Sequence, residues 1–175
     1  MERVGEFEKV SFEQFYEAML EIINAEYEDK DRFIKCAYEN VSLPERATGG
    51  SAGYDFKAPF SFELRPGETL KIPTGIRVRI DDGWWLGCLP RSGLGFKYRL
   101  QLNNTVGVID SDYHESDNEG HIFAKVTNDS NENKTVSIKA GSGFIQAIFI
   151  PYGITYSDNA SGVRNGGMGS TDARK

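Results

Sequence analysis

The sequence predicts an all-β protein, an antiparallel sandwich or barrel, with an amphipathic helix at its N-terminus. Three observations indicate this fold. Short apolar runs separated by turn residues begin near residue 33, glycine is frequent at 19 of 175 residues, and helical periodicity is confined to the first 32 residues. No second helical pattern of comparable length is present, which argues against an alternating α/β fold. The length fits one domain.

The N-terminal helix is expected to begin at Ser11, which with Gln14 fits a capping box. One apolar stripe follows at three- and four-residue spacing, formed by Phe12, Phe15, Tyr16, Met19, Leu20, Ile22 and Ile23. Residues 1–32 hold ten acidic and four basic side chains, so this extension carries the whole net charge of −6. Such a stripe packs on the protein's own body or subunit, or it binds a partner; most amphipathic helices are packing faces, so we expect packing.

The region from residue 33 reads as strands and turns. Ile76, Val78 and Ile80 alternate with arginines, which is typical of a half-buried strand. Turn residues at 66–67 and 81–83 bound it, and apolar runs follow at 84–89, 106–109, 121–126, 135–138 and 144–150. The last 17 residues, 159–175, are rich in Gly, Ser, Asn and Thr, so we expect them to be mobile unless a ligand orders them.

Composition excludes several classes of protein. An apolar content of 39% with an acidic balance argues against disorder and against non-specific nucleic-acid binding. No apolar run approaches the roughly 20 residues of a membrane span, and the charged start is unlike a signal peptide, which favours the cytoplasm. Cys36 and Cys88 stand in apolar settings and are expected to be buried thiols, which leaves no disulfide framework, zinc site or zinc-deaminase signature.

Five short segments carry residue types that packing alone does not require: 50–55, 90–94, 104–113, 143–146 and 164–171. In the last segment an arginine, several glycines and two hydroxyls suit a phosphate lid, although such tails are more often plain disorder. Arg91, Ser92 and Gly93 repeat the same chemistry in what is otherwise an exposed turn. Two such elements in one small domain favour a polyphosphate ligand.

The third segment ends an apolar run with two carboxylates and an aromatic ring. Strand alternation is expected to place Asp110 and Asp112 on one face, where an aspartate near phosphates could deprotonate a water, and Tyr113 could pack on a sugar. The alternative is a solvated hairpin end. The following loop brings together His114, Asp117, Glu119 and His121, which could be read as a metal cluster; their spacing matches no regular site, so a solvated loop is expected.

These five segments, in this order, resemble the five motifs of the trimeric dUTP diphosphatases (dUTPases), over residues 33–171. The resemblance implies a jelly-roll domain over residues 33–158, after the helical extension of residues 1–32, and a flexible arm over 159–175 that closes the active site. It implies a homotrimer with shared active sites and no nucleic-acid or membrane partner. The implied reaction is hydrolysis of dUTP to dUMP and pyrophosphate with Mg²⁺, in pyrimidine deoxynucleotide metabolism.

The resemblance also assigns roles to residues. Asp110 would activate the water that attacks the α-phosphorus, and Tyr113 would stack on the deoxyribose and exclude a 2′-hydroxyl. The uracil would be read by Asn104 and by the backbone around Gly107 and Phe123. The phosphates would be held by Arg91, Ser92, Gly93 and Gln146, and from a neighbouring subunit by Arg164, Ser170 and Thr171. Asp55 would support the phosphate and metal region through water, with Mg²⁺ bound mainly by the triphosphate.

The chain departs from the family pattern in three places. Met168 stands where a phenylalanine usually covers the uracil, the loop at residues 114–120 is about five residues longer, and the minimal family domain lacks the N-terminal helix. Two other interpretations stay open: a dCTP deaminase-like relative, against which Asp110 and Tyr113 argue, and a regulatory protein that keeps the nucleotide site and acts through a partner of the acidic helix.

Overall fold

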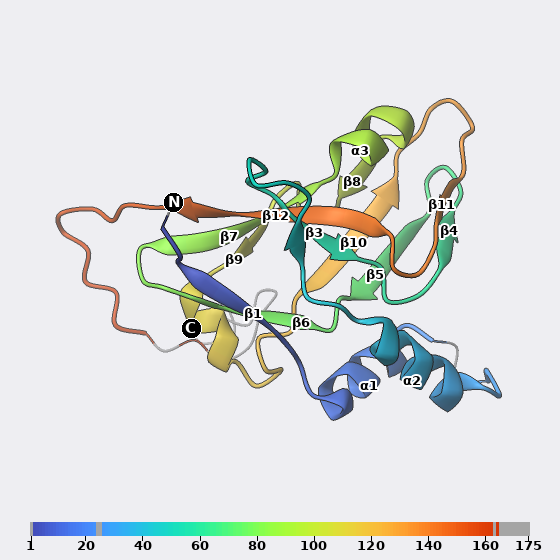
Figure 1. Ribbon diagram of the computed structural model, residues 1–175, viewed down its shortest axis with the longest axis horizontal. Coiled ribbons are helices and arrows are strands. Elements are labelled where there is room, and N and C mark those ends of the chain that lie inside the picture. Colours follow the sequence, from blue (N-terminus) through green and yellow to red (C-terminus); the bar gives the residue numbers. More distant parts are fainter. Residues whose placement is uncertain (1, 24–25, 163, 165–175) are drawn as a thin grey trace.

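The computed structural model describes residues 2–23, 26–162 and 164, which form mostly strands, turns and loops (Figure 1). The largest sheet has five strands, in the order β2 (Glu45–Arg46), β3 (Tyr54–Lys57), β12 (Gly143–Pro151), β7 (Trp84–Pro90) and β9 (Gly107–Ile109). The long strand β12 pairs with β3 on one side and β7 on the other, so strands far apart in the sequence lie together.

Three smaller sheets complete the β-structure. They are the three-stranded sheet β5 (Thr69–Pro73), β10 (Phe123–Asn128) and β8 (Leu100–Leu102), and the pairs β1 (Gly5–Lys9) with β6 (Ile76–Ile80) and β4 (Phe62–Leu64) with β11 (Val136–Ile138). Every pairing is antiparallel. The prediction of an all-β, jelly-roll type of fold with an N-terminal helix is confirmed.

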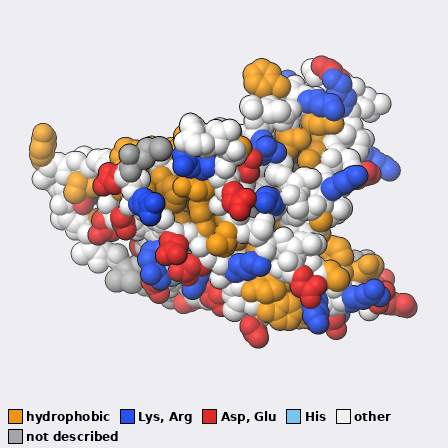
Figure 2. All heavy atoms as spheres, in the orientation of Figure 1, with side chains coloured by type: hydrophobic (Ala, Val, Ile, Leu, Met, Phe, Trp, Pro, Cys, Tyr) orange, Lys and Arg blue, Asp and Glu red, His pale blue; other side chains and the backbone are white. Residues whose placement is uncertain are grey.

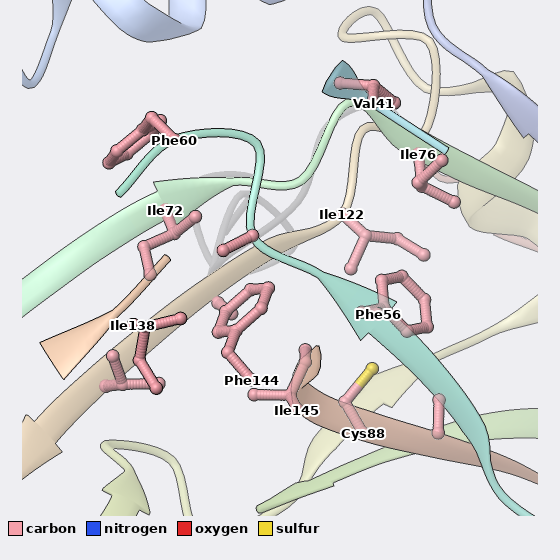
Figure 3. Close-up of a cluster of buried hydrophobic side chains, with 14 of the residues drawn as sticks. Val41, Phe56, Phe60, Ile72, Ile76, Cys88, Ile122, Ile138, Phe144 and Ile145 are labelled. Atoms are coloured by element: carbon pink, nitrogen blue, oxygen red, sulfur yellow. The ribbon is translucent and has the colours of Figure 1, made fainter. Parts of the chain in front are cut away.

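The core is one continuous cluster to which all four sheets contribute. It forms because alternate residues of each strand turn inward, as in β6, where Ile76, Val78 and Ile80 are buried. Figure 3 shows Phe56 of β3, Ile145 of β12 and Cys88 of β7 turned toward the same space. Close packing of this kind fixes the backbone positions from which the polar site residues project.

The N-terminal helix α1 (Phe12–Leu20) begins as expected, because the Ser11 hydroxyl accepts a hydrogen bond from the backbone of Gln14 at 3.1 Å. The second half of the expected capping box differs. The backbone nitrogen of Ser11 donates to Glu119, 108 positions away, at 2.7 Å. Phe15 and Met19 are fully buried, so the apolar stripe packs on the protein's own body.

Three elements differ from the expectation. The helix α2 (Lys30–Asn40) has 11 residues and is longer than α1, which has nine, although only Ile34 and Ala37 are buried, so its apolar stripe is short. Cys36 lies on the outer side of α2 and is exposed, so the expectation of a buried thiol is wrong there and right for Cys88. The strand β1 extends the β-structure into the acidic extension, where its glutamates face the arginines of β6.

Two short helices stand beside the site: α3 (Ser92–Tyr98) and the 3₁₀ helix η1 (Ser111–Glu115). Each begins one residue after a strand: Arg91 separates β7 from α3, and Asp110 separates β9 from η1. Within the described part of the chain, no helix has the length and apolar character needed to cross a bilayer.

Candidate active site

A polar cavity of about 520 Å³ lies where the loop before β3 meets the start of α3. Its lining includes most of the residues predicted to hold phosphates, together with Asp55; the lining residues are Ala47, Ser51, Ala52, Gly53, Asp55, Arg91, Ser92, Gly93, Leu94 and Gln146. We call it the phosphate pocket. Three different motifs of the sequence therefore meet in one cavity.

Arg91 is held in the phosphate pocket by two neighbours. Its Nε and Nη2 lie 3.0 and 3.1 Å from the two carboxylate oxygens of Asp55, and its Nη1 donates to the carbonyl of Gly143 at 2.9 Å. A Cβ on Gly143 would lie 2.7 Å from Nη1, so a larger residue there would displace the guanidinium. The arrangement fixes a cation at the wall of the cavity.

The rest of the phosphate pocket is ordered by backbone contacts. Gln146 donates from Nε2 to the carbonyl of Pro90 at 3.0 Å, and a Cβ on Gly53 would lie 2.7 Å from its Oε1. Arg46 donates to the carbonyls of residues 49 and 51 and so closes the loop before β3, which we call the phosphate loop. A Cβ on Gly93 would meet nothing within 4 Å, so this side of the first turn of α3 is open to a ligand.

A second cavity, of about 380 Å³, is mostly apolar and lies between β9, β10 and η1. We call it the nucleoside pocket; its lining residues are Lys71, Cys88, Leu102, Asn103, Asn104, Gly107, Val108, Ile109, Tyr113, Phe123, Ala124, Lys125 and Arg164. The four described residues predicted to contact the nucleoside are all among them. At Gly107 a Cβ would lie 3.0 Å from Cβ of Cys88, so the strands approach closely under the pocket.

Tyr113 is buried at the wall of the nucleoside pocket, and its hydroxyl both donates and accepts a hydrogen bond. The hydroxyl donates to the carbonyl of His121 at 2.8 Å and accepts from Nδ2 of Asn118 at 2.8 Å. Burial raises the pKa of this hydroxyl above its usual value of 10, although the bond from Asn118 acts in the opposite direction. The ring is therefore a neutral, fixed surface.

Asp110 and Asp112 converge on one cation. Arg164 donates from Nη2 to Asp110 at 2.5 Å and from Nε to Asp112 at 2.8 Å. Strand alternation, which was expected to place both carboxylates on one face, is not the reason. The strand β9 ends at Ile109, and Asp112 lies in the first turn of η1. Arg164 thus lies at the nucleoside pocket, whereas Met168, Ser170 and Thr171 lie outside the described residues.

The histidine-containing loop does not gather into a metal site. Within the described ranges, no three His, Cys, Asp or Glu side chains stand where they could hold an ion. The expected solvation is also wrong for both rings: His114 is buried beside Glu8 and Glu115, and Nε2 of His121 accepts from the backbone of Gly75 at 2.9 Å. Burial lowers the pKa of His121 from 6.5 to about 3, so this ring is neutral.

Sequence reasoning missed several pocket residues. Cys88, Asn103, Lys71 and Lys125 all line the nucleoside pocket, and Arg46 orders the phosphate loop. The two lysines are partners across β5 and β10, a pairing that only the sheet register reveals. Among these residues, only Asn103 could have been noticed in the sequence, because it directly precedes Asn104 of the third segment.

The fold is of the jelly-roll type, and it carries two pockets, one lined by polar donors and one mostly apolar. The family model described as dUTPase matches residues 39–172. The chain therefore belongs to the dUTPase family.

Two curated relatives are similar over most of their length. The deoxyuridine 5′-triphosphate nucleotidohydrolase of Lactococcus lactis subsp. lactis is 39% identical over 141 residues, which cover 78% of this chain and 93% of that protein. The protein of the same name from Tolumonas auensis is 41% identical over 137 residues, covering 74% and 86%.

Two solved structures show the same fold. The crystal structure of dUTPase from Streptococcus mutans has a TM-score of 0.61 and 32% identity, and covers 85% of this chain and 97% of that one. A mutant dUTPase from phage phi11 of S. aureus, described with the coordination of a structural Mg(II) ion, has a TM-score of 0.57 and 23% identity, covering 71% and 92%. At this lower identity the likeness concerns the fold.

Proposed function

We propose that the chain hydrolyses dUTP to dUMP and pyrophosphate. The observation that carries the proposal is the position of Asp110. This carboxylate follows β9, whose residues line the nucleoside pocket, and it is bound to Arg164, which lines the same pocket. The curated relatives named as deoxyuridine 5′-triphosphate nucleotidohydrolases support the choice of substrate.

In the proposed reaction Asp110 accepts the proton of a water whose oxygen attacks the α-phosphorus. The bond between the α-phosphorus and the bridging oxygen breaks, and pyrophosphate leaves. Phosphoryl transfer depends mostly on positioning and charge stabilisation, which the arginines of the two pockets supply. Arg164 must release Asp110 before this step, because its guanidinium occupies a carboxylate oxygen that would accept the proton.

The nucleoside is assigned to the pocket beside Tyr113. The amide of Asn104 offers both a donor and an acceptor to the uracil edge, as do the backbone groups of Gly107 and Phe123. The fixed ring of Tyr113 packs on the deoxyribose and leaves no room for a 2′-hydroxyl. Met168 covers the uracil ring as a flexible apolar side chain.

The triphosphate is assigned to Arg91, Ser92, Gly93 and Gln146. When bound with the substrate, Mg²⁺ neutralises phosphate charge and orients the chain of phosphates. The donor set fits such an ion only through the substrate: among the described residues, Asp55 is the one carboxylate that lines the phosphate pocket, and both its oxygens face Arg91. Asp55 then holds Arg91 and reaches the metal through water, in keeping with the hydration that Mg²⁺ retains.

A homotrimer with active sites shared between subunits completes the proposal. Trp85, Ile148 and Ile150 lie half-exposed on the face of the largest sheet opposite to Leu86, and Val108 next to them is 57% exposed. Figure 2 shows hydrophobic side chains gathered in the middle of one face of the molecule. An uncovered apolar face of this kind favours contact with another copy.

The pockets themselves also favour sharing. Among the described residues, the phosphate and nucleoside pockets have no lining residue in common. One nucleotide would then take its phosphate contacts and its nucleoside contacts from different subunits, with the arm of residues 159–175 closing from a neighbour. Action in the cytoplasm stays a prediction from the sequence.

The test is turnover of dUTP, dCTP, dTTP and UTP by the purified chain with Mg²⁺, with nucleotide products and pyrophosphate resolved by ion-exchange chromatography. We expect dUMP and pyrophosphate in equal amounts from dUTP, and little product from the other three. An inactive Asp110→Asn variant beside a fully active Asp82→Asn variant, whose aspartate is exposed at the turn after β6, would link the activity to the site. Deamination of dCTP, or binding of dUTP without hydrolysis, would contradict the proposal.

A further inference from the structure

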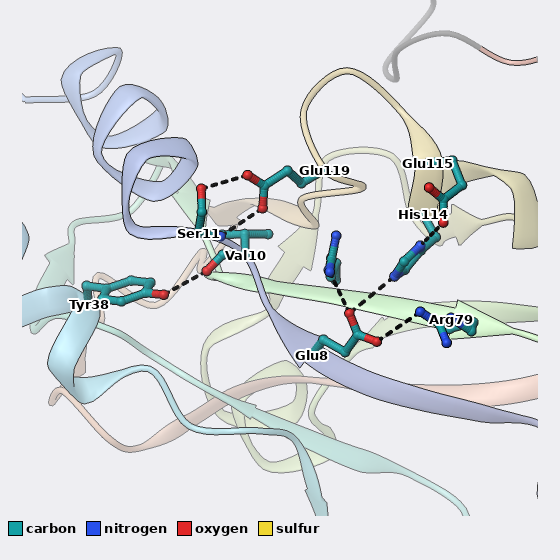
Figure 4. Close-up of polar contacts among 9 residues, drawn as sticks. Glu8, Val10, Ser11, Tyr38, Arg79, His114, Glu115 and Glu119 are labelled. Atoms are coloured by element: carbon teal, nitrogen blue, oxygen red, sulfur yellow. Dashed lines mark hydrogen bonds and ion pairs between the residues drawn. The ribbon is translucent and has the colours of Figure 1, made fainter.

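Two of the three places where the sequence departs from the expected family pattern, the N-terminal helix and the longer loop, contact each other. Glu119, in the longer loop of residues 114–120, accepts hydrogen bonds from the backbone nitrogen and the hydroxyl of Ser11 at 2.7 and 2.6 Å (Figure 4). Burial by itself would raise the pKa of Glu119, but these bonds outweigh it and lower the pKa below 4.5. The loop thus caps the start of α1 with a charged carboxylate.

A second contact between the extension and this loop comes from β1, which precedes α1 in the sequence. Glu8 of β1 stands 3.4 Å from Nε2 of His114 and forms ion pairs with Arg77 at 2.7 Å and Arg79 at 3.4 Å. Figure 4 shows Glu8 joined by dashed lines to His114 and to Arg79 of β6. Both β1 and the start of α1 are therefore bound to the segment that begins with η1.

The same loop holds Tyr113. Asn118, the residue before Glu119, donates to the hydroxyl of Tyr113, and the carbonyl of His121 accepts from it. Gly120 closes the loop at φ +66, where a Cβ would lie 2.8 Å from the carbonyl oxygen of Tyr113. A shift of Glu119 therefore moves groups that are hydrogen-bonded to the Tyr113 hydroxyl.

A separate route leads from α1 to the opposite wall of the nucleoside pocket. The ring of His121 lies 6.2 Å from Phe15 of α1 and 4.5 Å from Phe123, which lines the pocket. Glu21, at the end of α1, pairs at 2.7 Å with Lys71, and Lys71 lies 4.5 Å over the Phe123 ring. The extension supports both Tyr113 and Phe123.

We propose that residues 4–21 are a positioning element of the nucleoside pocket, which acts through Glu119 and Asn118 to hold Tyr113 where it discriminates deoxyribonucleotides from ribonucleotides. This inference rests on the proposed function, because it takes Tyr113 as the surface that excludes the 2′-hydroxyl. Glu119 and Asn118 touch no reacting atom and are positioning residues. Their loss is expected to alter selectivity more than the chemical step.

The decisive variants are Glu119→Ala, which removes both bonds to Ser11, and Glu119→Gln, whose amide keeps an acceptor for the Ser11 backbone and a partner for its hydroxyl. Asn118→Ala removes the donor to Tyr113 and leaves the contact with the extension intact. Asp117→Asn in the same loop and Glu17→Gln on α1 are matched controls, because both side chains are exposed. Thermal melting and light scattering establish that each variant is folded and assembled like the parent.

Three measurements are made on each variant: kcat and KM for dUTP and UTP, the affinities for dUMP and UMP by calorimetry, and hydrogen exchange of residues 111–121. We expect Glu119→Ala and Asn118→Ala to lower the dUTP-over-UTP ratio of kcat/KM by about tenfold, the lower end of what a pocket contact contributes to discrimination. The change should fall mainly on KM, with faster exchange in η1. Glu119→Gln and both controls should stay near the parent.

An unchanged ratio in a folded Glu119→Ala variant would overturn the proposal, and so would loss of the ratio in Asp117→Asn. Should Glu119→Ala unfold, Ser11→Ala, which removes the hydroxyl that donates to Glu119 and leaves the loop itself unchanged, is measured in its place. Failure of the proposed function is distinguishable, because it appears as a parent that does not hydrolyse dUTP. The ratio of dUMP to UMP affinity then tests the positioning element on binding alone, and a parent that binds the two equally would refute it.

Discussion

Nη2 of Arg164 lies 2.5 Å from Oδ2 of Asp110, so this guanidinium is paired with the carboxylate to which we assign water activation. The pair is partly exposed, with 23% of the arginine and 44% of the aspartate side chain accessible. Solvent weakens such a pair, so triphosphate oxygens can compete for the guanidinium. In the proposed reaction, binding of substrate would thereby free the base and bring Arg164 onto the phosphates.

Replacing Asp110 by asparagine keeps the shape of the site and removes the proton acceptor. We expect turnover of dUTP to fall by about 10²–10⁴-fold, the usual contribution of a general base, while a non-hydrolysable dUTP analogue still binds. Single-turnover kinetics measure the loss of turnover, and calorimetry measures the binding of the analogue. Asp112→Asn is the control, because it removes the other negatively charged partner of Arg164, and it should slow turnover far less. Equal losses in both variants would argue against Asp110 as the base.

Arg164 can be tested by the geometry of its donors. Lysine keeps the positive charge but lacks the planar fork that spans two acceptors, and glutamine loses the charge as well. We expect kcat/KM for dUTP to fall in the order parent, Arg164→Lys, Arg164→Gln. Steady-state kinetics with dUTP measure this series. A glutamine variant as active as the parent would mean that the arm acts without its arginine.

Asp55 is expected to act through Arg91. Asp55→Asn places an amide beside Nε and Nη2, which weakens the two-point ion pair and lets the guanidinium leave the wall of the phosphate pocket. We expect a higher KM for dUTP and weaker binding of pyrophosphate, measured by kinetics and calorimetry. Glu45→Gln is the matched control, because Glu45 is paired with Asp55 across β2 and β3 and forms its ion pair with Lys57.

Local sequence pattern predicted the elements whose own residues determine burial. The alternation in β6 and the stripe of α1 each specify one buried face, and both elements are present. The strand β1 has only Phe7 as an apolar residue and forms because Glu6 and Glu8 lie opposite the arginines of β6. The helix α3 follows Arg91 in a segment that reads as a turn, since its glycines disfavour a helix.

The candidate site divides in the same manner. The motif residues could be named from the sequence because their types are unusual for a surface: a carboxylate after an apolar strand, or an arginine among glycines. The supports of those residues could not be named, since Glu119 meets Ser11 and Asn118 meets Tyr113 only after the chain has folded. Such pairs follow from tertiary packing, which leaves no periodic signal.

The stability of the extension can be tested at Phe15, which is fully buried between Tyr38 and His121. Truncation to alanine removes the ring and leaves a cavity, so we expect Phe15→Ala to lower the free energy of unfolding by about 3–5 kcal/mol. Urea unfolding followed by circular dichroism measures it. Phe12→Ala, at a ring that is 36% exposed, should cost clearly less, and equal losses would mean that α1 is not docked as described.

The buried His121 predicts how stability depends on pH. Its pKa is about 3 in the folded chain and about 6.5 when exposed, because burial disfavours the charged ring. As pH falls from 6.5 towards 3, the unfolded chain takes up a proton that the folded chain does not. The contribution of the neutral ring is therefore complete above pH 6.5 and is lost on acidification. Between pH 6.5 and 5 the free energy of unfolding should fall by on the order of 1 kcal/mol per pH unit.

Two carboxylates of the same region act in a lower window. The pKa values of Glu8 and Glu119 are lowered below 4.5, despite the opposing effect of burial, so their stabilisation is lost only as pH falls below that value. The window above pH 5 thus isolates the histidine.

The chain has two histidines, and each can be replaced by glutamine. At position 121 the glutamine Oε1 keeps an acceptor for the Gly75 backbone. Urea unfolding at pH 7, 6 and 5 should show that His121→Gln abolishes the slope and His114→Gln retains it. The reverse result would place the titrating ring at His114 and reject a neutral, buried His121.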